Sequence, residues 1–192
     1  MRKSTKIISV LLALSLLSST SLFAKEIDDV SEFNSSIGVY TLAGVSAGIG
    51  LWGLQYQHWF NNRIGAAFDF SALYNSDLTD APQNKMFVNF NAEFDYALYR
   101  FELSKDVASQ LYLWALGGVE FKDKLVYEYT SEDYQEIDKD SVLVNAVVGL
   151  GFAFDFTFYK HISVPVQIGF LGTFPHDTCF DFCLGTGLRY SF

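Results

Sequence analysis

The sequence predicts an all-β fold, an eight-stranded antiparallel up-and-down transmembrane β-barrel that a cleaved signal peptide precedes. Bulky apolar side chains alternate with small or polar ones through eight segments, which places one set on each face of a strand. Half of the residues are hydrophobic, yet no run of 18 apolar residues, the length of a membrane-spanning helix, follows the leader. A chain this apolar needs either a large core or a surface that faces lipid.

Residues 1–24 have the pattern of a secretory signal peptide. Three basic residues open the segment, an apolar core follows from Ile7 to Leu17, and small residues lead to a predicted cut after Ala24. A membrane-anchoring helix is the alternative, but this core is shorter than the roughly 20 residues that such a helix needs. The mature chain then divides into a short periplasmic tail, residues 25–33, and a single barrel domain, residues 34–192.

The mature chain is strongly acidic. Without the three basic residues of the signal peptide, ten Lys and Arg stand against 22 Asp and Glu. Contacts with nucleic-acid phosphates need Lys and Arg, so the composition argues against nucleic acid as a partner.

The eight alternating segments differ in clarity, and the sixth is the clearest. From Val142 to Phe158 every even position is apolar, whereas Asn145 and Asp155 stand at odd positions. The fifth is the least clear because both of its faces carry apolar residues; Leu111 and Val119 are expected to face outward. The predicted strands are residues 34–43, 51–60, 63–74, 86–100, 110–122, 142–158, 162–170 and 182–192.

The predicted connections alternate in length, as in transmembrane barrels with short periplasmic turns and longer external loops. Asn61–Asn62 is expected to form a tight turn because Asn tolerates positive φ. The longest connection, residues 123–141, is acidic, and its extended segment Leu125–Tyr129 indicates a hairpin that projects beyond the membrane. Gly172–Cys179 is expected to be the last loop.

Volume decides which face of the strands points toward lipid. The interior of an eight-stranded barrel is just wide enough for side chains to fill. The bulky set, which includes Phe90, Phe94, Phe152 and Phe154, does not fit there, whereas the small and polar set does. The bulky face is therefore predicted to point outward.

Aromatic side chains gather at the predicted strand ends, where membrane proteins place them at the interfaces with water. In the alternative of a soluble sandwich, they are ordinary strand-end residues. The predicted periplasmic girdle comprises Trp59, Phe60, Tyr99, Phe101, Tyr159 and Phe192, and the outer girdle comprises Tyr74, Phe87, Phe174 and Phe180.

The predicted interior carries several ionisable side chains. Buried carboxylates must be paired, hydrogen-bonded or protonated, and Arg189 lies at a depth similar to that of Asp155, so these two are expected to form an ion pair. Structural filling is the simpler interpretation of this set, and a proton or cation path is the alternative. The predicted polar network comprises Asp69, Glu93, Asp95, Glu120, Asp155 and Arg189.

Cys179 and Cys183 are candidates for a disulfide, with free thiols as the alternative. In a straight strand, residues four apart are separated by about 13 Å, so a bridge requires the loop to fold back. The acidic connection lacks the glycine and the ligand spacing of an EF-hand, and His176 beside the cysteines is weak evidence for a metal. We therefore expect no cofactor and no metal.

His161-Ile162-Ser163 resembles the His-x-Ser element of the lipid A deacylases, which are also eight-stranded barrels. That family's motif continues with Asn, whereas Val164 follows here, and the predicted topology puts His161 at a periplasmic turn. We therefore expect no enzyme activity.

The last strand ends on Leu188, Tyr190 and Phe192, all on its apolar face. With the strand count and the alternation, this end resembles the small OmpA-like and OmpX-like barrels of Gram-negative outer membranes over residues 34–192. The resemblance implies an outer-membrane location and gives the three terminal side chains the role of an assembly signal. It also implies four kinds of partner: outer-membrane lipid and lipopolysaccharide, the barrel-assembly machinery, periplasmic chaperones, and an extracellular ligand at the external loops.

Three functions remain open at this point. The first is a structural or surface-interaction role in envelope integrity or adhesion. The second is a narrow channel or a port for hydrophobic solutes, as the OmpW-like barrels suggest. The third is an enzyme that modifies lipid A.

Overall fold

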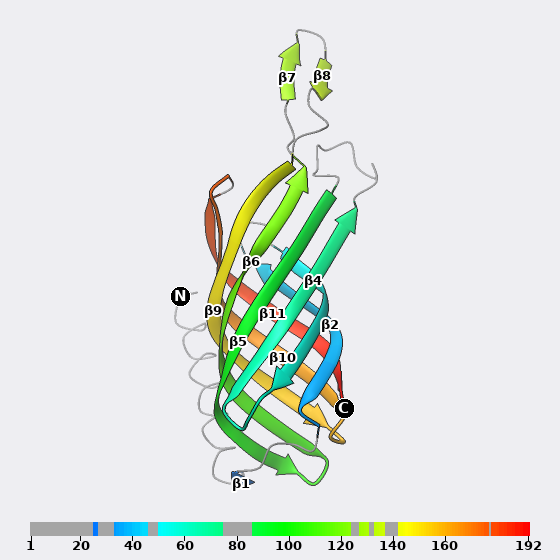
Figure 1. Cartoon of the computed structure of the whole chain (residues 1–192), viewed down its shortest axis with the longest axis vertical. Helices are drawn as coiled ribbons and strands as arrows, with labels where there is room; N and C mark the ends of the chain where they lie inside the picture. The colour runs from blue at the N-terminus through cyan, green and yellow to red at the C-terminus, as the bar shows by residue number, and fades with distance from the viewer. Residues whose placement is uncertain are drawn as a thin grey trace, which may run out of the picture.

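Eight long strands close into one antiparallel barrel in the computed structural model (Figure 1). The structure describes residues 25–26, 33–45, 50–74, 86–123, 127–130, 133–136, 142–176 and 178–192. The predicted signal peptide lies outside the described residues. Among those residues, no helix is long and apolar enough to cross a membrane.

The barrel strands follow one another around the wall in chain order, so the predicted up-and-down topology is confirmed. They are β2 (Ser35–Gly44), β3 (Gly50–Trp59), β4 (Ile64–Tyr74), β5 (Met86–Ser104), β6 (Val107–Asp123), β9 (Val142–Phe158), β10 (Ile162–Phe174) and β11 (Cys179–Ser191). Each strand pairs with the next, and β11 pairs with β2 to close the wall. A two-residue strand, β1 (Lys25–Glu26), pairs with the end of β5.

The predicted orientation of the two faces is confirmed. Bulky apolar side chains stand on the outside, where Val39, Leu54 and Leu150 are each more than half exposed. Polar side chains such as Asn89 and Asp95 are fully buried on the inner face. Exposure of an apolar surface of this extent to water is unfavourable, so the outer face requires lipid around it.

The last external loop is present but shorter than the predicted Gly172–Cys179, because β10 ends at Phe174 and β11 begins at Cys179. Gly172, Thr173 and Phe174 continue β10 and pair with β9, and Thr173 also pairs with Cys179 of β11. The sequence pattern missed this extension because Leu171 and Gly172 break the alternation, being buried in succession.

The Asn61–Asn62 turn is present, but its expected cause was wrong. The described residues with positive φ, apart from glycine, are Tyr159 and Lys160 in the turn between β9 and β10. Asn61 instead accepts hydrogen bonds through its side-chain oxygen from the backbone N–H groups of Arg63 and Ile64, at 2.8 and 2.9 Å. The side chain therefore closes this turn.

A β-bulge at Leu98 shifts the register of β5 against β6. Ala97 pairs with Tyr112 and Tyr99 pairs with Leu111, so Leu98 is the extra residue. Arg63 donates hydrogen bonds from Nη1 to the carbonyl oxygens of Ala97 and Leu98, at 3.3 and 2.8 Å. The bulge reverses which residues of β5 face inward near the short-turn end of the barrel.

The predicted projecting hairpin is present. β7 (Tyr127–Thr130) and β8 (Asp133–Glu136) form a separate two-stranded sheet. Figure 1 shows this sheet beyond the ends of β6 and β9, on the side opposite the short turns and the carboxy-terminus.

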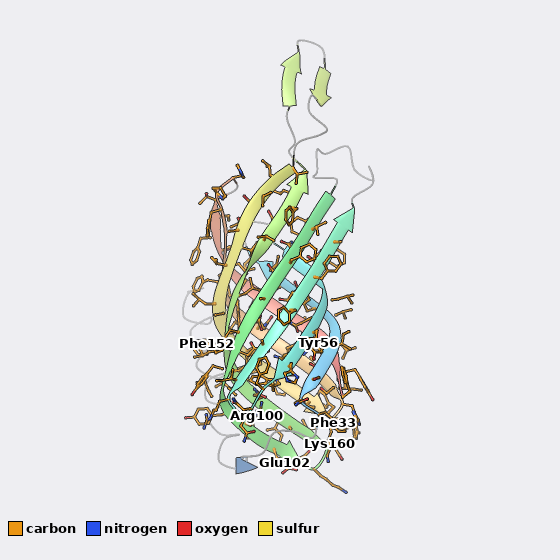
Figure 2. The ribbon with its side chains drawn as sticks, viewed as in Figure 1. Phe33, Tyr56, Arg100, Glu102, Phe152 and Lys160 are labelled. Atoms are coloured by element: carbon orange, nitrogen blue, oxygen red, sulfur yellow. The ribbon has the colours of Figure 1, made fainter. Side chains whose placement is uncertain are left out.

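Charge placed on the outer face tests the lipid-facing assignment. Phe152 points outward at mid-height of the barrel (Figure 2), and Phe152→Arg should lower the free energy of unfolding by about 2–4 kcal/mol in lipid vesicles. Phe180 stands near the outer rim, where Phe180→Arg should cost only about 0–1 kcal/mol. Urea unfolding in vesicles measures both values, and equal costs at the two depths would contradict the assignment.

Candidate functional site

Arg189 of β11 lies at the centre of the polar interior. Its side chain is 2% exposed and pairs through Nη2 with Oδ2 of Asp155 on β9. The other terminal nitrogen, Nη1, donates a hydrogen bond of 3.0 Å to Oε1 of Gln55 on β3. One guanidinium therefore links three strands, because its planar fork directs two nitrogens to two separate acceptors, which the single ammonium of lysine cannot reproduce in the same way.

Two glutamines reach the carboxylates of β5. Gln57 of β3 donates to Oδ2 of Asp95 at 2.7 Å. Gln167 of β10 donates from Nε2 to both oxygens of Glu93, each at 3.1 Å. Amide donors thus partner two carboxylates that Arg189 does not bond directly, and they connect strands that are not neighbours in the wall.

A second polar group lies nearer the external loops. Asn145 donates from Nδ2 to Oε1 of Glu120 at 3.0 Å, and Lys122 stands 3.4 Å from the same oxygen. Oδ1 of Asn145 accepts the backbone N–H of His176 at 3.0 Å. Glu120 is therefore separate from the Arg189 group and anchors the last loop through Asn145.

Asp69 is buried on β4 between these groups. Neither of its carboxylate oxygens has a hydrogen-bond partner among the described residues, and the side chains of Asn89 and Asn91 beside it are also unpartnered there. The structure thus places the six predicted network residues inside the barrel but bonds only Asp155 directly to Arg189. The central part of the interior, with Asp69, Glu93, Asp95 and Asp155 around one arginine, is rich in carboxylates.

Large apolar side chains also fill the interior, which the sequence analysis missed. Trp114 is 2% exposed, and its indole donates from Nε1 to the carbonyl oxygen of Phe152 at 3.1 Å. A Cβ atom added to Gly149, Gly151 or Gly169 would lie within 2.7–2.9 Å of the indole, so these glycines make room for it. The fully buried apolar or aromatic side chains include Leu42, Leu51, Tyr112, Val147 and Leu171.

Trp59 belongs to the interior and not to the periplasmic girdle, so that assignment was wrong. Its ring packs edge-on against Tyr112, with centroids 5.6 Å apart, and the guanidinium of Arg100 lies 4.8 Å above it. Gly65 on the neighbouring strand leaves space for the indole. The odd position of Trp59 in β3, shared with Gln55 and Gln57, was the available signal.

The candidate disulfide between Cys179 and Cys183 is absent, because both are free thiols. Both residues belong to β11, which is extended from Cys179 onward. Residues four apart on an extended strand are about 13 Å apart, too far for a bridge.

His161 and Ser163 make their side-chain hydrogen bonds to other residues and not to each other. Nδ1 of His161 lies 2.9 Å from the carbonyl oxygen of Ser191, and the ring stacks on Tyr190 with centroids 5.3 Å apart. Oγ of Ser163 lies 3.1 Å from Oγ1 of Thr157. Among the described residues, no three His, Cys, Asp or Glu side chains gather as a metal site.

The three residues of the predicted assembly signal stand on the outer face. Leu188, Tyr190 and Phe192 are 53–54% exposed at the short-turn end of β11. They are thus accessible from the lipid side and from the periplasmic rim.

Solved structures with the same architecture come from bacterial outer membranes. The solution structure of outer membrane protein H (OprH) from P. aeruginosa in DHPC micelles matches with a TM-score of 0.51 and 13% identity, covering 83% of this chain and 99% of that one. The N-terminal β-barrel domain of Pseudomonas aeruginosa OprF has a TM-score of 0.48, 11% identity and coverages of 83% and 97%. Neisserial surface protein A has a TM-score of 0.42, 13% identity and coverages of 83% and 95%. No protein-family model and no curated protein sequence matches the chain.

At these identities the likeness concerns the fold alone, and the OprH match supports it. The chain is an eight-stranded β-barrel of the outer-membrane type, with a lipid-facing apolar belt and a filled interior.

The pair at the centre of the barrel can be tested by removing one partner or both. Arg189→Met leaves the buried carboxylate of Asp155 uncompensated and should lower the free energy of unfolding by about 3–5 kcal/mol. The double variant Arg189→Met/Asp155→Leu should recover most of that loss. Lys105→Met, which removes an exposed cation from the turn between β5 and β6, is the control and should cost about 0.5 kcal/mol or less. An Arg189→Met barrel as stable as the parent would contradict the central role of this pair.

Proposed function

We propose that this outer-membrane barrel acts without catalysis, as a non-conducting scaffold that presents the β7–β8 hairpin to a partner outside the cell. The membrane-spanning part contributes stability and position. The hairpin contributes the contact.

The filled interior is the observation that carries this proposal. Trp114, Tyr112 and Leu171 occupy the middle of a barrel whose interior is only as wide as its side chains. The Arg189 group and the two glutamine–carboxylate links cross the remaining space. A solute path would require several of these contacts to break together, which argues against the channel and the hydrophobic-solute port.

The hairpin has the features of a contact surface. β6 and β9 pair along their whole length, from Val107–Phe158 to Asp123–Val142, so they form a rigid base for it. Within the described part of the chain, β7 and β8 pair only with each other, which leaves an unpaired edge on each strand. Such edges accept an added strand from a partner.

The charge of this region favours a basic partner. Residues 123–141 contain seven Asp and Glu against two Lys. Opposite charges on two proteins speed their association, whereas like charges disfavour it.

The filled interior predicts a lack of conductance. In planar bilayers the folded barrel should produce no discrete channel openings above the baseline of the empty membrane. Unboiled samples that migrate differently from boiled ones on a gel establish that the inserted protein is folded. Reproducible openings that disappear on heat unfolding would favour the channel instead.

Removing the hairpin should abolish partner binding and leave the barrel intact. A variant in which a Gly-Ser turn replaces residues 127–136 should keep its heat-modifiable migration, since no strand of the barrel wall is altered. Bacteria that display this variant should lose adhesion to cultured host cells, compared with bacteria that display the parent chain. A matched variant with Glu128→Gln, Glu132→Gln, Asp133→Asn and Glu136→Gln keeps the length and separates the effect of charge from that of the strand edges. Undiminished adhesion after removal of the hairpin would reject the surface role.

A further inference from the structure

A cavity of about 280 Å³ opens at the short-turn end of the barrel, on the side opposite the hairpin. Figure 2 shows Arg100, Glu102, Phe33 and Lys160 at this end of the molecule. Its volume is close to the ~300 Å³ at which small-molecule sites begin. Most of the residues that line it are polar, and six of them are serines: Ser35, Ser36, Ser104, Ser109, Ser163 and Ser191.

Arg100 lines this cavity because of the bulge at Leu98. Up to Ala97 the odd residues of β5 face inward, and after the extra residue the inner face passes to the even residues. Tyr99 is therefore 61% exposed on the outside, while Arg100 is half-buried over the ring of Trp59. Arg63 stabilises the bulge through its hydrogen bonds to Ala97 and Leu98, so a built feature of the fold directs this cation inward.

The Arg100 guanidinium forms no salt bridge within the part of the chain that the structure describes, although the charge of Asp155 attracts it from across the cavity. Its cation–π contact with Trp59 holds the plane of the group in place, and its Nε atom is buried without a hydrogen-bond acceptor. A half-buried cation without a salt bridge has lost part of its hydration, and a bound anion would compensate for that loss.

A neighbour of Arg100 also has a hydrogen-bond donor without an acceptor. Gln110 of β6 is its direct cross-strand partner, lines the same cavity, and has a buried Nε2 atom without a described acceptor. Asp155 of β9 is the other cross-strand partner of Gln110 and also lines the cavity, but its charge is compensated by Arg189. The charged rim residues Glu102, Lys105 and Asp106 are exposed, so water and salt screen them.

We propose that this cavity is a binding site for a small oxyanion, a carboxylate or phosphate group that Arg100 holds with its planar fork while Gln110 donates a further hydrogen bond. The recognition needs no change of the barrel, because Trp59 already fixes the guanidinium. An oxyanion of this kind can come from a soluble periplasmic solute or from a lipid headgroup at the inner leaflet of the outer membrane. The two sources share the chemistry at Arg100 and differ in the rest of the ligand.

Nuclear magnetic resonance of the ¹⁵N-labelled mature barrel in micelles of an uncharged sugar detergent tests the site. Acetate, inorganic phosphate and dihexanoyl phosphatidate are the probes. Binding should shift the side-chain N–H signals of Arg100 and Gln110 in a saturable way. Saturable shifts with acetate or phosphate would identify a soluble anion as the ligand, and saturable shifts with the phosphatidate alone would identify a lipid headgroup. Either result supports the proposal. Lack of saturable shifts at these side chains with all three probes would overturn it.

Variants assign the effect to the guanidinium. Arg100→Gln should weaken binding by about tenfold to a hundredfold, the range expected for losing a charged hydrogen bond. Arg100→Lys, which keeps the charge and loses the fork, should fall between this variant and the parent. Lys139→Gln removes the same charge from the connection between β8 and β9 and should bind like the parent. Heat-modifiable migration establishes folding of each variant, and equal affinity in folded Arg100→Gln would reject the site.

Discussion

Closure of the wall between β2 and β11 is the constraint on which the rest of this structure depends. In lipid, every backbone N–H and C=O must find a partner within the protein, and an open sheet edge would leave a row of them unpaired. β11 satisfies this requirement by pairing with β2 from Cys183–Gly44 to Ser191–Ser36, while its other edge pairs with β10. The first and last strands of the domain therefore complete the wall together.

Closure with eight strands fixes the radius, and the radius fixes what the interior can hold. Bulky side chains fit inside only where the adjacent residue has no side chain. The glycines of β9 and β10 leave this space for Trp114, and Gly65 leaves it for Trp59. Polar groups occupy the remaining space, and several are bonded to strands that are not their neighbours in the wall, as Arg189 is to Asp155 and Gln55. Because the middle is filled, the parts available for interaction lie at the two ends. These are the hairpin on one side and the cavity around Arg100 on the other.

Much of the barrel wall could be predicted from the alternation of side chains, because apolar residues at every second position indicate which face of a strand contacts lipid. The bounds of β9 were predicted to the residue, and its even positions do face outward. The interior was harder, since the volume argument allowed mainly small and polar side chains there, whereas Tyr112 and Trp114 are large. The outward orientation predicted for Leu111 and Val119 does place these two on the inner face. Apolar residues on both faces of β6 were the visible signal of a buried aromatic group.

The bulge at Leu98 could not be predicted, because it depends on a contact from another turn, the hydrogen bonds that Arg63 makes to the β5 backbone. For the same reason the cavity and the inward position of Arg100 were invisible in the sequence. The cysteines are unbridged because β11 begins at Cys179, before the alternating sequence pattern starts. The pairing of Thr173 with Cys179 holds this part of the chain extended, so it cannot fold back to bring Cys179 and Cys183 together.

Which side chains of β9 touch lipid is the most direct test of the account. Photolabelling of the folded barrel in vesicles, with phospholipids that carry a diazirine in the acyl chain, can be followed by mass spectrometry at residue resolution. Labels are expected on Leu150, Phe152 and Phe154, which face lipid, and none on Gly151, Ala153 or Asp155, which face the interior. Labels on the second set, or on both sets equally, would contradict a barrel with its apolar face outward.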